Sequence, residues 1–521
     1  MILGLWAQTE AEARRHDVAP RDRRLAFVGL ARHPPSPPDE VESPDASAEV
    51  VVVDGGGAVD LSPLRAWLAE ADGPYAVMHG SQATLHALQP DSRAPADPWA
   101  PQHRGDTEIA ARLLAAAAGD ARAELDLPQT VARTLNHQIA GETRGRREPA
   151  SDVQGQTAAA ASVLVPVMQA LTPLLRRAQL TRVYALEMKL VPAVVAMERT
   201  GFGIDAVAFE KIAAGWARER RQDPPADRLP RLDKLLSTYA HWPRDFARRG
   251  RIHCQLHPLA AESGRFSCTD PNLQQVPGQH TAPGLRACFV PAPGHVLIVA
   301  DYAQIELRVA AHLAPCAALR AVFAAGRDPH RTTAATITGR PESEITDRER
   351  KLAKAVNFGF LFGMGAKRFA SYARNSYGVE VNDVEARRAR EAFLDTYPGI
   401  AAWHRRVGAL GRGAAVTVRT ALGRRKRFAA GAFSFNSALN IPVQGTAAEG
   451  FKHAMVQLNA RLGALQGRGV LVVHDEYIAE VPQAHADAGR ALVQSVMAAA
   501  MGEIVTSVPI VVEAEIKRHW S

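Results

Sequence analysis

Two apolar runs that lie far apart in the chain each lead into acidic residues, and this pairing constrains the fold most. Residues 295–300 (HVLIVA) have the continuous apolar character of a buried strand and are followed by Asp301. Residues 469–473 (GVLVV) predict a second buried strand, which passes through 474–476 (HDE) into a third strand at 477–481. The sequence therefore predicts a sheet with a separate acid at one strand end and a hairpin tip that carries two acids.

Carboxylates at strand ends suit divalent cations. Mg²⁺ prefers carboxylate oxygens, water and substrate phosphates, so Asp301 and Asp475 are candidates to hold two Mg²⁺ ions, with Mn²⁺ as a substitute. Two such ions activate an attacking hydroxyl and neutralise a leaving pyrophosphate. The residues alone leave simpler interpretations open. Asp301 could cap the helix that the periodicity of 302–312 predicts, and 474–476 could be a merely polar hairpin tip.

A basic helix is predicted between these acids, at residues 350–363 (RKLAKAVNFGFLFG). Positions four apart advance by about 40° on a helix. Arg350, Lys354, Phe358 and Phe362 therefore form one stripe of two cations and two aromatic rings. This stripe suits a triphosphate on the cations and a sugar and base against the rings. The alternative is a basic surface helix with an apolar end.

Length and composition set broader bounds. A chain of 521 residues predicts two to four domains, and 47% apolar with 22% charged residues is typical of a soluble globular protein. The net charge of +8 indicates a polyanionic partner such as nucleic acid, or equally a solvated basic surface. The four cysteines form no C-x-x-C pair, which favours buried thiols in a reducing interior. No apolar run is long enough for a membrane span, so we expect a cytoplasmic protein.

The organisation changes along the chain. Residues 1–150 mix short apolar runs with Pro-rich breaks and predict an α/β domain. Its predicted elements are strands at 25–30 and 50–53 and helices at 62–71 and 107–118. A helical pattern follows at 158–210, and the basic, Pro-containing stretch 218–231 predicts a linker or loop.

Short motifs follow one another between residues 263 and 476. Three of them contain the acids and the basic helix: 301–308 (DYAQIELR), 350–363 and 473–476 (VHDE). The others are 263–267 (SGRFS), 270–274 (DPNLQ), 328–330 (DPH), 397–399 (YPG), 423–425 (GRR) and 442–448 (PVQGTAA). Together they resemble the family A (DNA polymerase I-like) DNA polymerases, with the first three matching motifs A, B and C.

The resemblance implies an α/β multidomain architecture, in which an RNase H-like exonuclease-type domain precedes a right-hand polymerase fold of palm, fingers and thumb. The domains it implies are 1–180, a degenerate 3′–5′ exonuclease-like domain; 181–256, a shortened helical thumb; 257–315, the first part of the palm with its antiparallel sheet; 316–415, the helical fingers; and 416–521, the second part of the palm.

The resemblance also implies roles for individual residues in a DNA polymerase. The metal ligands would be Asp301, Asp475 and the Tyr302 carbonyl, with Glu476 nearby and Lys354 as general acid toward pyrophosphate. The residues that bind the incoming dNTP would be Arg350, Lys354, Phe358, Phe362, His330, Gln304 and Glu306. The residues that contact primer-template DNA would be Arg265, Asn272, Gln274, Asn440, Gln444 and His474. Minor-groove acceptors are nearly independent of sequence, so such contacts check base-pair shape.

Three positions bear on sugar selection in this family. Glu306 matches the steric gate that excludes a ribose 2′-OH, which argues against the related single-subunit RNA polymerases. Phe358 matches a position where Phe is associated with discrimination against dideoxynucleotides. Phe362 stands where bacterial relatives usually have Tyr, so a hydroxyl that can bond the gate glutamate is missing and sugar selection is expected to be looser.

The N-terminal part departs from a working proofreading exonuclease, which needs a D-x-E pair and two further aspartates. Residues 8–10 (QTE) stand where D-x-E belongs, and 75–89 contains no aspartate. Asp152 matches the third motif, but Glu148 replaces its tyrosine. We therefore expect no proofreading.

The thumb looks short, because only about 45 residues separate Asp205 from Arg251. Since the thumb grips duplex DNA through phosphates, we expect weak, salt-sensitive binding and low processivity. The leading hypothesis is a monomeric, nucleoid-associated DNA polymerase without proofreading, used in repair or gap filling. The alternatives are a degenerate polymerase that serves as a DNA-binding or assembly subunit, and a 3′–5′ exonuclease.

Overall fold

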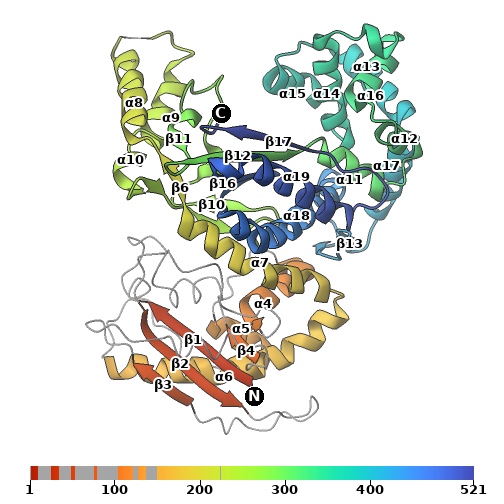
Figure 1. Ribbon diagram of the computed structural model, residues 1–521. Helices are drawn as coiled ribbons and strands as arrows, with labels where there is room; N and C mark the ends of the chain where they lie inside the picture. The colour runs from red at the N-terminus through yellow and green to blue at the C-terminus, as the bar shows by residue number, and fades with distance from the viewer. Residues whose placement is uncertain are drawn as a thin grey trace.

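The computed structural model describes residues 2–9, 25–33, 48–52, 75–78, 104–120, 127–135, 150–222 and 224–521 (Figure 1). The predicted helix at 62–71, the residues Glu10 and Glu148, and most of 75–89 lie outside the described residues.

The N-terminal part contains a five-stranded sheet in the order β3-β2-β1-β4-β5. The strands are β1 Ile2–Thr9, β2 Leu25–His33, β3 Ala48–Val52, β4 Tyr75–Met78 and β5 Arg104–Asp106. Strand β1 is antiparallel to β2 and parallel to β4. The helices are α4 Thr107–Ala118, α5 Leu127–Leu135 and α6 Ala150–Arg177, and α6 packs against β1, β2 and β3. The predicted strands near 25 and 50 and the predicted helix at 107–118 are confirmed.

Helix α7 (Thr181–Thr200) follows and lies between the N-terminal part and the rest of the molecule in Figure 1. Beyond it come α8 Ala206–Arg221, α9 Leu229–Thr238 and α10 Trp242–Asp245. The prediction of a loop over 218–231 is therefore wrong at both ends. Arg218, Arg220 and Arg221 fill the last turn of α8, where cations stabilise the carbonyl end of a helix, and only 222–228 joins the two helices.

The sheet that carries the candidate acids has four strands in the order β15-β16-β12-β17. Its members are β12 His295–Tyr302, β15 Arg468–Val473, β16 Glu476–Pro482 and β17 Val512–Lys517. The predicted buried strands and the hairpin are confirmed. Strand β12 reads as a continuous apolar run because β16 and β17 flank it and its residues from Val296 to Ala300 are buried.

Two helical groups flank this sheet, with α8–α10 on one side and α12–α17 on the other (Figure 1). The helices that follow β12 are α11 Ile305–Leu313, α12 Ala317–Ala324, α13 Pro329–Thr338, α14 Asp347–Leu361, α15 Ala366–Tyr372, α16 Asp383–Thr396 and α17 Pro398–Leu410. The shorter strands are β6 Phe202–Ile204, β7 Ala247–Arg248, β8 Arg251–Ile252, β9 Gln255–His257, β10 Ser267–Thr269, β11 Phe289–Val290, β13 Val416–Arg419 and β14 Arg425–Phe428.

Helices α18 (Phe435–Arg461) and α19 (Ala486–Gly502) pack on each other, and α18 also contacts α7 and α11. Helix α18 is buried around most of its circumference, so it lacks the polar face of a surface helix. Its buried polar residues Glu449 and Lys452 join Glu187 of α7 and Arg424 in an ionic cluster. This cluster ties α7, the β13–β14 hairpin and α18 together.

All four cysteines are free and buried, as the sequence predicts. Among the described helices, none has a stretch long and apolar enough to cross a membrane.

Candidate active site

Three acids meet at one end of the four-stranded sheet. Ala300 of β12 pairs with Tyr477 of β16, which places Asp301 beside the start of β16. Val473 pairs with Glu476, so His474 and Asp475 form a two-residue turn, with His474 in the left-handed region at a φ of 58°. The acids that the sequence places at separate strand ends therefore lie together.

The environment of these acids favours a cation. Burial first, and then the charges of Asp475 and Glu476, raise the pKa of Asp301 to about 7. Although Asp301 is exposed, the protein around it limits its hydration. Burial also raises the pKa of Asp475 and of Glu476, against the attraction of Arg265 for the first and a hydrogen bond from Trp520 for the second. Crowded carboxylates of this kind are stabilised by a divalent cation.

The protein supplies some, but not all, of the oxygen ligands that a Mg²⁺ ion requires. Carboxylate oxygens of Asp301 and Asp475 are available, and the Tyr302 carbonyl lies at the end of β12. Within the described part of the chain, no group of three or more His, Cys, Asp or Glu residues forms a complete metal site. Mg²⁺ commonly takes its remaining ligands from water and substrate phosphates, so a partial protein site is consistent with it.

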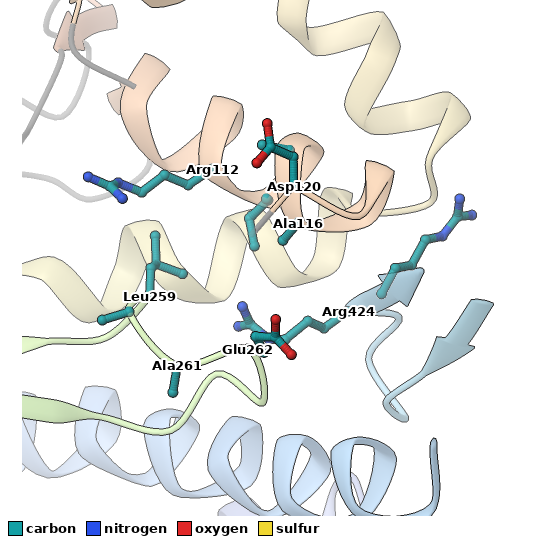
Figure 2. A pocket seen from close by; sticks show the side chains of 11 residues that line it. Arg112, Ala116, Asp120, Leu259, Ala261, Glu262 and Arg424 are labelled. Carbon is teal, nitrogen blue, oxygen red and sulfur yellow. The ribbon is translucent and has the colours of Figure 1, made fainter. Parts of the chain in front are cut away.

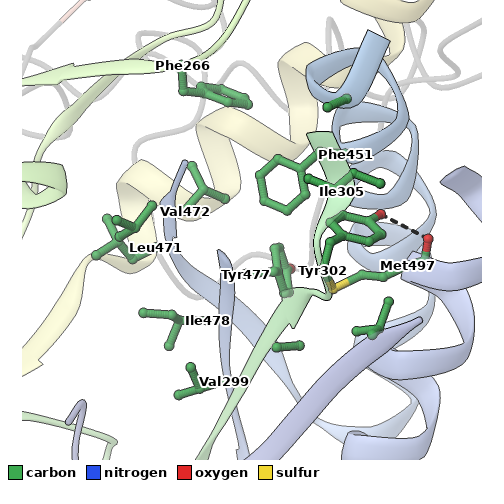
Figure 3. Close-up of a cluster of buried hydrophobic side chains, with 14 of the residues drawn as sticks. Phe266, Val299, Tyr302, Ile305, Phe451, Leu471, Val472, Tyr477, Ile478 and Met497 are labelled. Atoms are coloured by element: carbon green, nitrogen blue, oxygen red, sulfur yellow. Dashed lines mark hydrogen bonds between the residues drawn. The ribbon is translucent and has the colours of Figure 1, made fainter. Parts of the chain in front are cut away.

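The Tyr302 side chain has a separate, structural position. It is buried, and its hydroxyl donates to the Met497 carbonyl at 2.9 Å (Figure 3). Figure 3 shows it in an apolar cluster with Ile305, Phe451 and Tyr477. This cluster fixes the backbone that carries Asp301.

Glu306 lies on α11, five residues after Asp301, and is held by two of the residues predicted to contact DNA. Its Oε1 accepts a hydrogen bond from Arg265 at 2.8 Å and another from Gln444 at 3.1 Å. Gln304, at the N-terminus of α11, is half-buried with a φ of 50°. The structure thus brings the predicted sugar gate, part of the predicted DNA surface and the acids into one region.

The predicted basic stripe lies on α14, which packs against α11. Lys354 is exposed and Arg350 and Phe358 are half-buried, whereas Ala355 and Val356 between them are buried. Phe362 directly follows the last helical residue and is half-buried. Arg350, Lys354 and Phe358 therefore occupy the open face of the helix, and Phe362 lies just beyond its end.

Two residues of the 328–330 motif contact this stripe. Asp328 accepts a hydrogen bond from Arg350 Nε at 2.6 Å. His330 is buried, with its ring centroid 5.9 Å from that of Phe358. Every residue predicted to bind the nucleotide therefore lies on α11, α13 or α14, or next to one of them.

The remaining predicted DNA contacts are spread over nearby elements. Gln274 donates to the Val472 carbonyl at 3.1 Å, and the Asn272 Oδ1 is buried without a hydrogen-bond partner in the described structure. Asn440 is half-buried on α18, and His474 is exposed at the hairpin tip. Gln274 therefore abuts the β15 strand that leads to His474.

Sequence reasoning missed residues that support the site from outside its motifs. Trp520 donates to Glu476, Asn357 contacts His330, and Thr333 and Tyr397 contact each other beside Asn357. Asn357 lies inside the basic helix, but the spacing argument used only positions four apart. Nothing in the sequence pattern connects Trp520 with the hairpin.

One pocket lies elsewhere, between α4, residues 259–262 and the start of β14 (Figure 2). Arg112, Asp120, Glu262 and Arg424 are among its lining residues. None of the residues predicted to bind metal, nucleotide or DNA lines it, so it is distinct from the candidate site.

Comparison with known proteins places the chain in a family. The model of DNA polymerase family A matches residues 170–521. DNA polymerase I of Aquifex aeolicus (strain VF5) is 35% identical over 292 residues, which are 56% of this chain and 48% of that protein. The thermostable DNA polymerase I of Thermus aquaticus is 35% identical over 367 residues, 66% of this chain and 41% of that protein. The chain thus spans less than half the length of these relatives.

A solved structure is similar over the entire chain. It is the POL domain of Pol1 from M. smegmatis, in complex with DNA primer-template and dNTP. The TM-score is 0.82 at 22% sequence identity, with 100% of this chain and 95% of that chain covered, which shows a likeness of fold. The mixed helix and sheet content accordingly fits a right-hand polymerase fold. Because the family model covers more than half of its residues, the chain belongs to DNA polymerase family A.

Proposed function

We propose that this protein is a template-directed DNA polymerase that adds dNTPs to a primer 3′-OH by two-metal-ion nucleotidyl transfer. The observation that carries the proposal is the meeting of Asp301, Asp475 and Glu476 at one sheet end, next to α11. The basic helix α14 packs on the same α11, which brings cations for a triphosphate close to acids for metal ions.

The proposed division of the chain follows this arrangement. Residues 257–315 and 416–521 form the palm, which includes the four-stranded sheet. Residues 316–415, with α12–α17, form the fingers, and 181–256, with α7–α10, form a short thumb. Residues 1–180 form the exonuclease-like domain.

Asp301, Asp475 and the Tyr302 carbonyl hold two Mg²⁺ ions in this proposal, with Glu476 beside them. The bound ions supply an activated primer hydroxyl and a neutralised pyrophosphate. Lys354 and Arg350 bind the triphosphate, because both lie on the open face of α14. Lys354 then donates a proton to the departing pyrophosphate.

The sugar and base of the dNTP lie against Phe358 and Phe362, with His330 and Gln304 lining the same pocket. Glu306 excludes a ribose 2′-OH. Its hydrogen bonds to Arg265 and Gln444 support this role, because they hold the carboxylate in one place. Together with Arg265 and Gln444, the residues that contact primer-template DNA are Asn272, Gln274, Asn440 and His474.

The biological setting of the proposal is short-patch repair or gap filling by a monomeric, nucleoid-associated enzyme. Residues 8–10 and Asp152 supply too few acids for two exonuclease metals, so the enzyme does not proofread. Helix α8 ends at Arg221 and α9 begins at Leu229, which leaves little chain for a thumb tip and supports low processivity.

Primer extension with Mg²⁺ and four dNTPs tests the proposal. Wild-type protein should extend the primer, and Asp301→Ala and Asp475→Ala should each abolish extension. Asp487→Ala, which removes an exposed acid of α19, is the matched control and should extend normally. No extension by wild-type protein, or full extension by either site variant, would refute the proposal.

A lane without dNTPs on the same gel tests proofreading. We expect no shortening of the primer. Shortening that is lost in the double variant Glu10→Ala, Asp152→Ala would show a working exonuclease.

A further inference from the structure

A buried hydrogen-bond network of Asn357, Thr333 and Tyr397 lies against the His330 ring. The Nδ2 atom of Asn357, on α14, lies 2.8 Å from the Nδ1 atom of the His330 ring. The same Nδ2 is 3.2 Å from the Pro329 carbonyl oxygen. On its other side, Asn357 Oδ1 lies 2.8 Å from the Thr333 hydroxyl, which is 3.0 Å from the Tyr397 hydroxyl. All of these side chains are buried.

The Pro329 carbonyl fixes the orientation of the Asn357 amide. A carbonyl oxygen has no proton, so the amide group next to it must be the NH₂ and not the oxygen. With one amide proton on Pro329, the second points to His330 Nδ1. The amide oxygen then faces the Thr333 hydroxyl, which shares its one proton between this oxygen and the Pro329 carbonyl oxygen, each 2.8 Å away.

This orientation determines the state of the imidazole. A nitrogen that accepts a proton from an amide is itself unprotonated, so His330 Nδ1 has no proton. The proton of the neutral ring is then on Nε2. In the described structure Nε2 forms no hydrogen bond, although the ring as a whole is only 1% exposed. It is therefore the ring atom that remains free to donate.

The surroundings also oppose a charged ring. Burial lowers the pKa of His330 to about 4, and the cations Arg350 and Lys354 of α14 act in the same direction. Asp328, on the same element as His330, acts the other way but is paired with Arg350. Tyr397, which lies between α16 and α17, is the other titratable residue of the network. It stays protonated because burial raises its pKa to about 12.

We propose that Asn357 is a positioning residue that holds His330 as a neutral imidazole with its proton on Nε2, where it donates to a phosphate oxygen of the dNTP. This inference rests on the proposed polymerase function, because that function supplies the nucleotide. A neutral donor matches an anionic oxygen without adding a third positive charge near Arg350 and Lys354. Nucleotide binding through His330 is then constant around neutral pH.

The first test reads the tautomer directly and needs no activity. Long-range ¹H–¹⁵N spectra of protein labelled at histidine, compared with His330→Gln for assignment, report which ring nitrogen is protonated. We expect an unprotonated Nδ1, a protonated Nε2 and no titration between about pH 6 and pH 8. A protonated Nδ1, or titration in that range, would overturn the inference.

The second test uses Asn357→Asp, whose carboxylate cannot donate to Nδ1 and instead draws a proton onto it. We expect the KM for dNTP to rise about tenfold, with kcat changed less than about threefold. The ratio of variant to wild-type KM should also change between about pH 6 and pH 8, because His330 now titrates. Equal KM values, or a ratio that is constant with pH, would count against the inference.

Asn382→Asp is the matched control. Asn382 caps α16 through its side-chain oxygen, a role that Asp fills equally well, so KM and its pH dependence should not change. The outcomes separate the two proposals. A wild-type protein that fails to extend primers refutes the polymerase function, whereas an active enzyme with the wrong His330 tautomer refutes only this inference.

Discussion

The indole Nε1–H of Trp520 donates a hydrogen bond of 3.0 Å to the carboxylate of Glu476. Trp520 is 1% exposed, and its backbone N–H donates to the Phe289 carbonyl at 2.9 Å. The Arg286 guanidinium lies 4.4 Å above its ring and also attracts Glu476. A residue outside every recognised motif thus holds one acid of the candidate site in place.

Trp520→Phe should therefore weaken catalysis while keeping the aromatic packing. Loss of a buried hydrogen-bond donor costs about 1–3 kcal/mol, and a displaced Glu476 should slow single-turnover extension about tenfold. Stopped-flow extension and urea unfolding measure the two effects. Trp403→Phe in α17 is the control, because Trp403 is also buried but does not contact the acids. An unchanged extension rate in Trp520→Phe would contradict the prediction.

Asp328→Asn should lower the KM for dNTP. Asp328 pairs with Arg350 at 2.6 Å, so this cation must leave or share that contact to bind a triphosphate. Asn still caps α13, and partly exposed ion pairs are worth about 0.2–1 kcal/mol, so the KM should fall by up to about fivefold. Glu342→Gln, which breaks the nearby pair with Arg327, should leave the KM unchanged. A higher KM in Asp328→Asn would contradict this role of the pair.

Phe358→Tyr should increase the use of dideoxynucleotides. Wild-type protein is expected to discriminate against them, because a phenyl ring offers nothing in place of the missing 3′-OH. A tyrosine hydroxyl supplies a polar partner near the sugar and should raise the ratio of dideoxy to deoxy incorporation by about tenfold or more. Competition primer extension measures this ratio. Equal use of both substrates by wild-type protein would show that the expectation is wrong.

Phe362→Tyr should tighten the choice of sugar. Glu306 already accepts hydrogen bonds from Arg265 and Gln444, and a tyrosine hydroxyl at 362 would add a third donor to the gate. We expect ribonucleotide incorporation to fall by about threefold to tenfold, in line with one added hydrogen bond. Alkaline cleavage of the extended products measures ribonucleotide incorporation. No gain in discrimination would remove the proposed link between this position and Glu306.

The sequence predicted the elements whose patterns are local. Strands β12 and β15 are apolar throughout because they are buried, and α14 keeps Arg350 and Lys354 on one face because a helix repeats every 3.6 residues. The loop prediction at 218–231 is wrong because arginines do not by themselves indicate irregular chain. They are good helix formers, and in α8 they occupy the favourable last turn.

Contacts between distant segments were not predictable in this way. Trp520 and Glu476 are 44 residues apart, and Glu306 and Gln444 are 138 apart. Asn357 and His330 belong to different helices, so their hydrogen bond depends on how α13 packs on α14. The motifs identify which residues take part in the site, and the tertiary structure determines which of them hold each other.

The buried ionic cluster that joins α7, α18 and the β13–β14 hairpin has Lys452 at one end. Lys452 is fully buried, with its Nζ 2.5 Å from Glu187 Oε1 and 2.8 Å from the Pro258 carbonyl. Breaking a buried ion pair leaves an uncompensated charge, so Lys452→Met should lower the free energy of unfolding by about 3–5 kcal/mol. Adding Glu187→Gln should recover part of that loss. Lys426→Met, which breaks a partly exposed pair with Glu262, should cost at most about 1 kcal/mol.

The same lysine should make stability depend on pH. Burial lowers the pKa of Lys452 to about 8, from a usual value of 10.5 that the unfolded chain retains. Between these values the unfolded chain binds more protons than the folded protein, so the free energy of unfolding rises with pH. Below about pH 8 both states are protonated and the contribution of Lys452 is constant. Urea unfolding of wild-type protein and Lys452→Met should therefore diverge as the pH rises from about 8 towards 10.5, since other titrating groups cancel in the difference. A difference that stays constant over this range would mean that Lys452 keeps its proton in the folded protein.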